Sequence, residues 1–212
     1  MKGLIRNNFY SMESNLMVSF IMAAALVFSP LIINTPTVYP MIIAVQVFLF
    51  VVNTGTALHA DEVAKWNKFE ITLPIKRNTI VGAKYITFAI LIFCGLFLSS
   101  CTAICINFSG QIWNFSSILW GYEYGLVLSI ISVSLMYPII LKIGTEKNEL
   151  VLIFSAFAAI ALMCLIAAVL SPLTGEMNLQ HPLVGMVSIS VSLLMFIISF
   201  VVSVSIHKNK EF

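Results

Sequence analysis

Charged residues are scarce in this sequence: they make up 9% of its 212 residues, whereas 60% are hydrophobic. A soluble globular domain carries roughly a quarter charged residues. So few charged groups cannot give a chain of this length a water-facing surface, and we therefore predict a protein surrounded mostly by lipid. The net charge of only +2, with no basic run interleaved with aromatic residues, argues against a nucleic-acid partner.

The sequence also lacks the motifs of common hydrolytic sites. No Gly is followed by Lys, so there is no phosphate-binding loop of the G-x-x-x-x-G-K type. Asp61 is the only aspartate and no His precedes a Glu, which excludes an aspartyl dyad within one chain and an H-E-x-x-H zinc site. The four cysteines lie in apolar runs without the further ligands that a metal site needs. We predict no catalytic residues, no metal site and no cofactor of its own.

The apolar residues form six stretches that are long enough to cross a bilayer. A helix rises about 1.5 Å per residue and needs about 20 residues to span roughly 30 Å of hydrocarbon. The predicted spans are residues 14–33, 38–58, 80–106, 119–141, 150–170 and 183–206. Lys84, near the inner end of the third span, is expected to extend its amine toward the headgroups. No charged residue falls near mid-depth, which disfavours proton-driven antiport.

The cations lie on one side of these spans. All 11 Lys and Arg residues precede the first span, follow the sixth, or lie between or beside spans two and three and spans four and five. The three loops on the other side carry none. The positive-inside rule then places the basic side and both termini in the cytoplasm. The sequence thus predicts an all-α, multi-pass membrane protein with one transmembrane domain, residues 1–212.

Residues 1–13 form a separate segment before the first span. Leu4, Ile5, Phe9 and Met12 recur at spacings that place them on one helical face. This pattern predicts an amphipathic helix lying in the inner membrane interface. A frayed terminus is the alternative interpretation.

The largest inner segment, residues 59–79, joins spans two and three. Asp61 and Glu62 are expected to begin a short helix, where carboxylates favour the positive end of the helix dipole. Val63, Trp66 and Phe69 follow at spacings of three and give this helix an apolar edge, and Pro74 would end it. Insertion of the two aromatic rings into the headgroups is the alternative interpretation of this edge.

Several polar side chains recur along single faces of the predicted spans. They are Gln46 and Asn53 in span two, Ser129 and Ser132 in span four, and Ser188, Ser192, Ser199 and Ser203 in span six. Small and hydroxyl side chains favour close packing of membrane helices. The same faces are candidates for a translocation path, above all if two copies of the chain meet around them. Both interpretations stay open at this point.

The inner segment resembles that of a known family. Asp61-Glu62, Trp66 and the run from Leu73-Pro74 through Arg77 to Lys84-Tyr85 are similar to the pattern between spans two and three of small ABC type 2 exporter permeases. Tyr137-Pro138 with Lys142 and Gly144 is similar to a second family pattern after span four. The resemblance covers the whole chain. Within the family, the chain most resembles permease subunits of exporters for phenol-soluble modulins, which are amphipathic peptide toxins. The loop of residues 171–182 is too short for the re-entrant helices of larger exporters.

The resemblance implies a permease in a bacterial cytoplasmic membrane that exports amphipathic, cytolytic peptides. It implies a homodimer or heterodimer of permease chains and a separate cassette ATPase subunit, which binds ATP and Mg²⁺. It also implies that the inner segment is a coupling helix seated in a groove of that ATPase, with Trp66 and Phe69 as anchors. The candidate coupling residues are Asp61, Glu62, Val63, Trp66, Phe69, Leu73, Pro74 and Arg77.

Two alternative functions remain at this stage. A substrate-capture subunit of an energy-coupling vitamin importer has a similar length, but such subunits lack a long inner coupling segment. A non-transporting immunity or scaffold membrane protein is the other alternative.

Overall fold

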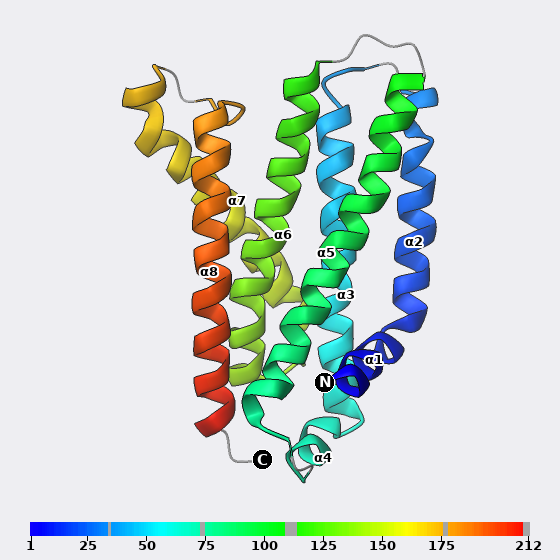
Figure 1. The fold of residues 1–212 in the computed structure, drawn as a ribbon, viewed down its shortest axis with the longest axis vertical. Coiled ribbons are helices and arrows are strands. Elements are labelled where there is room, and N and C mark those ends of the chain that lie inside the picture. The colour runs from blue at the N-terminus through cyan, green and yellow to red at the C-terminus, as the bar shows by residue number, and fades with distance from the viewer. Residues whose placement is uncertain (34, 73–74, 109–113, 176–177, 210–212) are drawn as a thin grey trace.

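The computed structural model describes residues 1–33, 35–72, 75–108, 114–175 and 178–209 (Figure 1). Throughout these ranges the regular structure is helical, which confirms the predicted all-α class. The elements are α1 (Lys2–Ser11), α2 (Glu13–Val27), the 3₁₀ turn η1 (Ser29–Leu31), α3 (Tyr39–Val63), α4 (Trp66–Thr72), α5 (Arg77–Phe108), α6 (Phe115–Ile143), α7 (Asn148–Thr174) and α8 (Pro182–Asn209).

Within the described ranges, six segments are long and apolar enough to cross a membrane, as predicted: α2 with η1, α3, α5, α6, α7 and α8. Figure 1 shows them as a bundle, with α1, α4 and the C-terminal end of α8 at one end. We call this the basic end, because the described Lys and Arg residues lie in or near it. The helices extend past the apolar stretches because polar residues at their ends continue the backbone hydrogen bonding; α5, for example, begins at Arg77.

Helix α3 lies at the centre of the bundle. Its most apolar window is 67% buried, against 17% for α2 and α8, which therefore lie at the periphery. Two glycines allow neighbouring helices to approach it closely. A Cβ atom added to Gly121 of α6 would lie 2.6 Å from the carbonyl oxygen of Pro40, and one added to Gly95 of α5 would lie 2.8 Å from the Cα of Val47. Glycine is needed where helix backbones come this close.

The short inner helix begins later than the sequence predicted. Asp61, Glu62 and Val63 form the last turn of α3, and α4 begins only at Trp66. The break falls at Lys65, whose φ of 54° is in the left-handed region. The prediction was wrong because residues 56–73 contain no Gly or Pro to mark the end of the long helix. Leu73 and Pro74, which was predicted to end the short helix, lie outside the described residues.

Candidate functional site

Helix α1 packs against the bundle at its basic end. Leu4 is buried in a cluster with Ile80 and Ala83 of α5. Asn8, 2% exposed, donates a hydrogen bond from Nδ2 to Oγ1 of Thr87, at 3.0 Å. The N-terminal segment is therefore a docked helix rather than a frayed end, and its polar contact fixes its rotation against α5.

A buried ion pair joins three helices next to this contact. The Lys84 amine of α5 pairs with the Asp61 carboxylate of α3 and donates to Oδ1 of Asn8 in α1, at 2.6 Å. Ser11 of α1 donates to the other Asp61 oxygen at 3.3 Å. We call Asp61, Lys84, Asn8 and Ser11 the ion-pair node. It holds α1, α3 and α5 together through charge and hydrogen bonds.

The ion-pair node corrects the prediction for Lys84. Its side chain is only 4% exposed and does not extend toward the headgroups. Removing two charges from water is costly, and the cost is offset only where they pair and form further hydrogen bonds. Asp61 supplies such a partner because the last turn of α3 lies beside the beginning of α5. A carboxylate at a helix C-terminus is disfavoured by the helix dipole, so Asp61 also gains from the neighbouring cation.

Glu62 points to a different part of the molecule. One of its carboxylate oxygens accepts a hydrogen bond from the backbone N–H of Thr145, at 2.8 Å, in the turn between α6 and α7. Gly144, with φ of 99°, ends α6 immediately before Thr145. The Nδ1 atom of His59 lies 3.1 Å from the Thr145 hydroxyl. The last turn of α3 therefore contacts α1 and α5 through Asp61 and the α6–α7 turn through Glu62.

The inner face of α4 packs against the same region. Trp66 packs on the cluster of Leu4, Ile80 and Ala83, and its indole N–H donates to Glu70 at 2.6 Å. The Glu70 side chain is 3% exposed, and this burial raises the pKa of its carboxyl, although the nearby Lys84 cation and the Trp66 hydrogen bond act in the opposite direction. Trp66 therefore packs within the chain, and these contacts hold α4 against α1 and α5.

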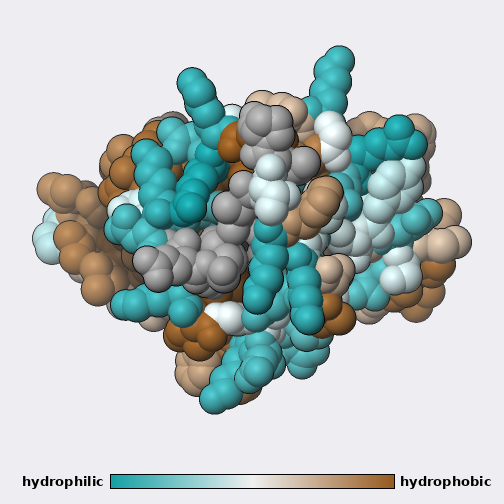
Figure 2. Space-filling model, turned by 90° about the horizontal axis from the view of Figure 1, so that it is seen from below, coloured by the Kyte–Doolittle hydropathy of each residue, from teal (hydrophilic) through white to brown (hydrophobic). Residues whose placement is uncertain are grey.

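The outer side of this region presents two apolar residues to solvent. Val63 is 70% exposed and Phe69 is 53% exposed, and the Phe69 ring lies 5.2 Å from the Trp66 ring. Figure 2 views the basic end directly and shows hydrophilic side chains projecting from much of it. We call Val63 and Phe69 the exposed pair. Apolar side chains at the charged end of a membrane protein need a lipid surface or a protein partner to cover them.

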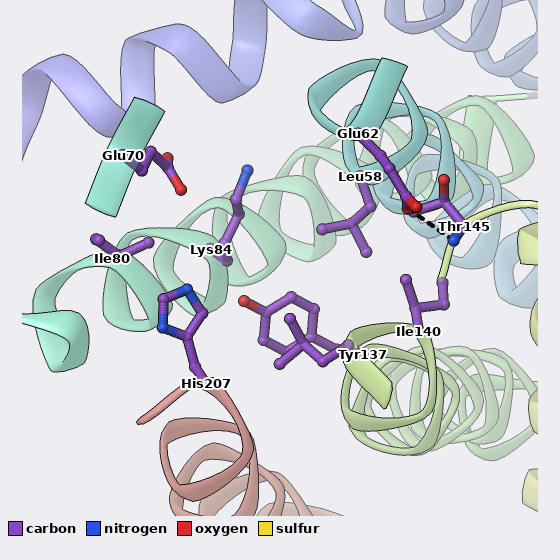
Figure 3. Close-up of a pocket in the computed structure, with 10 residues that line it drawn as sticks. Leu58, Glu62, Glu70, Ile80, Lys84, Tyr137, Ile140, Thr145 and His207 are labelled. Atoms are coloured by element: carbon purple, nitrogen blue, oxygen red, sulfur yellow. Dashed lines mark hydrogen bonds between the residues drawn. The ribbon is translucent and has the colours of Figure 1, made fainter. Parts of the chain in front are cut away.

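A small cavity lies between these helices at the basic end (Figure 3). Its volume is about 30 Å³, and Glu70, Lys84, Tyr137 and His207 are among its lining residues. In Figure 3 the side chains of Glu70 and Lys84 enter it from α4 and α5, and His207 enters from α8. A cavity of this size holds about one or two water molecules. It can hydrate the buried polar groups but cannot admit a peptide.

Arg77 stabilises the end of α8. Its Nη1 donates to the backbone carbonyls of His207 and Lys208, both at 2.6 Å. A cation at the last carbonyls of a helix satisfies their unpaired acceptors and complements the helix dipole. Of the predicted coupling residues that are described, Asp61, Glu62 and Arg77 form internal contacts, Trp66 packs inward, and the exposed pair faces outward.

The candidate path residues of α3 connect it to its neighbours. Gln46 is fully buried, donates to the carbonyl of Ala23 in α2 at 3.0 Å and accepts from Thr102 of α5 at 2.8 Å. Asn53 donates to Ser19 of α2 at 2.8 Å. These two amides thus link α3 to α2 and α5. Sequence periodicity placed them on one face but could not identify these partners.

The candidate serines lie on α6 and α8, which pack side by side. Ser129, Ser132, Ser188, Ser192, Ser199 and Ser203 are all buried. Ser199 donates to the carbonyl of Ser134 in α6 at 2.6 Å, and Ser192 donates to the carbonyl of Ile189 in its own helix at 2.7 Å. Ser199 therefore links α8 to α6, whereas Ser129 and Ser132 follow Gly125 by four and seven residues and so lie on the face of α6 that approaches Ala44 and Val47 of α3.

Within the described ranges, no three His, Cys, Asp or Glu residues are placed to hold a metal ion together. A family model described as ABC-2 family transporter protein matches residues 3–208, and so extends from α1 into the last turn of α8. No curated protein and no solved structure matches the chain.

Proposed function

Since the chain belongs to the ABC-2 family of transporter proteins and is a membrane permease component of an ABC transporter, we propose that it exports amphipathic peptides as a dimer driven by a separate cassette ATPase. The chain contains no phosphate-binding loop of the G-x-x-x-x-G-K type, so ATP and Mg²⁺ would be bound by the partner. The basic end would face the cytoplasm of a bacterial cell, as the positive-inside rule predicts.

The exposed pair on and next to α4 is the observation that carries this proposal. Phe69 on α4 and Val63 at the end of α3 present apolar side chains outward, and such a surface suits an interface in a partner's groove, in which a few anchors supply most of the binding energy. We assign the anchors to Val63 and Phe69. Trp66 packs on α1 and α5. Through these contacts, a movement of α4 would be transmitted to the membrane spans.

The ion-pair node supports the same mechanism. Asp61 lies four residues before Lys65, where the chain turns from α3 into α4, and it is paired with Lys84 of α5 and hydrogen-bonded to Ser11 of α1. Glu62 adds a hydrogen bond to the α6–α7 turn. A displacement of α4 by an ATPase would therefore act on α1, α3, α5 and this turn together, rather than bending a free loop.

Two features support a dimer and an amphipathic cargo. The central helix α3 is packed closely by α5 and α6, so a path wide enough for a peptide fits more readily between two chains than through one. The polar groups of the candidate path are hydroxyls and amides rather than charges. Such a surface suits a cargo with an apolar face. A vitamin-capture subunit or an immunity protein would not need an ATPase contact at α4.

The function is tested by purification and transport. A tagged chain isolated from its native membrane is expected to bring down a cassette ATPase. Inverted vesicles that contain this complex are expected to accumulate a fluorescent amphipathic helical peptide when ATP is supplied. A peptide of the same composition with its apolar residues scrambled is the control. Recovery of no ATPase, or equal accumulation of the two peptides without ATP, would contradict the proposal.

A further inference from the structure

A carboxylate without a counter-charge lies in the half of α6 away from the basic end. Glu123 follows the beginning of α6 at Phe115 by about two turns, and its side chain is half-buried. In the described part of the chain, this carboxylate has no hydrogen bond and no ion pair. The described Lys and Arg residues lie in or near the basic end, and a second copy in the same orientation would carry its cations there too. A cation that pairs with Glu123 therefore has to come from a different molecule.

Helix α8 faces this carboxylate with two small residues. A Cβ atom added to Gly185 would collide with the carboxyl group of Glu123, so these two residues meet where α6 and α8 pack. Ser188 lies three residues further along, on the same face of α8. Its side chain is fully buried, and its hydroxyl has no hydrogen-bond partner within the described ranges. The contact between the two helices thus contains a carboxylate and an unpaired hydroxyl.

Two aromatic residues share the face of α6 that carries Glu123. Trp120 and Tyr124 lie three residues before it and one residue after it, and their rings are 5.4 Å apart. Tyr124 packs on the same apolar cluster as Ile189 of α8, so this face is turned toward α8. The Nε1 atom of Trp120 is buried and, among the residues that the structure describes, has no acceptor. Native proteins rarely leave buried polar groups unpaired, and the indole N–H and the Ser188 hydroxyl therefore point to a ligand.

These groups together suit a primary amine. A carboxylate pairs with an ammonium group, and aromatic rings attract an organic cation to their faces. A divalent metal ion such as Ca²⁺ takes six or more oxygen ligands, whereas the described His, Cys, Asp and Glu residues form no group of three that could hold one. Ser188 can accept a hydrogen bond from an ammonium group, and the Trp120 N–H can donate to an oxygen of the same ligand.

We propose that Trp120, Glu123, Tyr124 and Ser188, which we call the Glu123 site, bind the primary ammonium group of a ligand. The ammonium donates to Glu123 and Ser188, and Trp120 donates to an oxygen close to it. Trp and Tyr side chains are typical of the headgroup region of a membrane, so a phosphoethanolamine headgroup reaches this depth directly. A lysine side chain of the transported cargo is the other source of the same group. The site does not depend on the proposal that amphipathic peptides are exported.

The test measures lipid binding to the purified chain in detergent by native mass spectrometry. The probes are phosphatidylethanolamine and, as the lipid without an amine, phosphatidylglycerol with the same acyl chains. Glu123→Gln keeps the size of the side chain and is expected to lower the affinity for phosphatidylethanolamine about tenfold, because a charge-assisted hydrogen bond is lost. The affinity for phosphatidylglycerol should not fall. Glu149→Gln, which removes an exposed carboxylate at the basic end, is the matched control and should leave both affinities unchanged.

A second variant changes the position of the carboxylate and keeps its charge. The added methyl group of Gly185→Ala displaces the Glu123 side chain, so this variant is also expected to weaken phosphatidylethanolamine binding while phosphatidylglycerol binding persists. The unfolding midpoint of each variant checks that it folds.

A soluble probe identifies the source of the amine. An amphipathic peptide with one lysine is compared with the same peptide acetylated on that lysine. Binding of phosphatidylethanolamine alone through Glu123 assigns the site to a lipid headgroup, and binding of the free-lysine peptide through Glu123 assigns it to cargo; either result supports the site. Equal affinity of the wild type and Glu123→Gln for both amine probes, or an equal loss of phosphatidylglycerol binding in Glu123→Gln, would overturn the inference. Neither result depends on ATP-driven export, so the proposed function is tested separately.

Discussion

Lys84→Ala is expected to destabilise the protein by about 3–5 kcal/mol, because it leaves the Asp61 carboxylate buried without its cation. The side chains of both residues are at most 5% exposed, so water cannot replace the missing charge without opening the contact between α1, α3 and α5. The measurement is the unfolding midpoint in lipid nanodiscs, followed by tryptophan fluorescence during heating.

The control removes both charges. The double variant Asp61→Leu with Lys84→Met replaces the pair by apolar side chains of similar volume, and such replacements are often neutral or stabilising. We expect it to recover most of the stability lost in Lys84→Ala. It should nevertheless weaken the link of α1 to α3 and α5, so that peptide export falls while the folded protein persists. A single variant as stable as the wild type would contradict the assignment of a buried ion-pair node.

Phe69→Ala is expected to weaken binding of the cassette ATPase about 30-fold, which corresponds to about 2 kcal/mol and is typical of an anchor residue. Because Phe69 is 53% exposed, its removal should have little effect on the unfolding midpoint. The measurement is the affinity of the purified permease for its ATPase. Phe108→Ala is the matched control, since Phe108 is 85% exposed but lies at the opposite end of α5.

Trp66→Ala separates the two roles assigned to this region. We expect this variant to affect the unfolding midpoint, which it lowers, more than ATPase binding, because Trp66 packs on Leu4, Ile80 and Ala83 and donates to Glu70. If Trp66→Ala abolished ATPase binding at unchanged stability while Phe69→Ala had no effect, the resemblance-based assignment of Trp66 as an anchor would be right, and the assignment of the exposed pair would be wrong.

The spans could be predicted from the sequence because each depends only on the apolar residues of its own segment. A run of about 20 apolar residues can be read without knowing its neighbours. The end of α3 could not be predicted, because the chain turns at Lys65, a residue type that gives no signal for a left-handed backbone. Residue spacing alone therefore predicted that the short helix begins at Asp61, whereas α4 begins at Trp66.

The site depended on contacts between distant residues. Asp61 and Lys84 each have a plausible local interpretation, and only the packing of α3 against α5 and α1 shows that they pair. Trp66 and Phe69 are equivalent in an apolar pattern, yet one packs inward and the other is exposed.

The central claim is that an ATPase at the basic end supplies the energy for transport by this permease. The most direct test is to determine which side of the membrane α4 faces. In a variant whose four native cysteines are replaced by alanine, cysteine is introduced at Phe69 or, as control, at Phe108. A membrane-impermeant maleimide is expected to label Phe69→Cys in inverted vesicles and Phe108→Cys in intact cells. Labelling of Phe69→Cys in intact cells would place α4 on the outer side, where no ATPase could reach it, and would contradict the account.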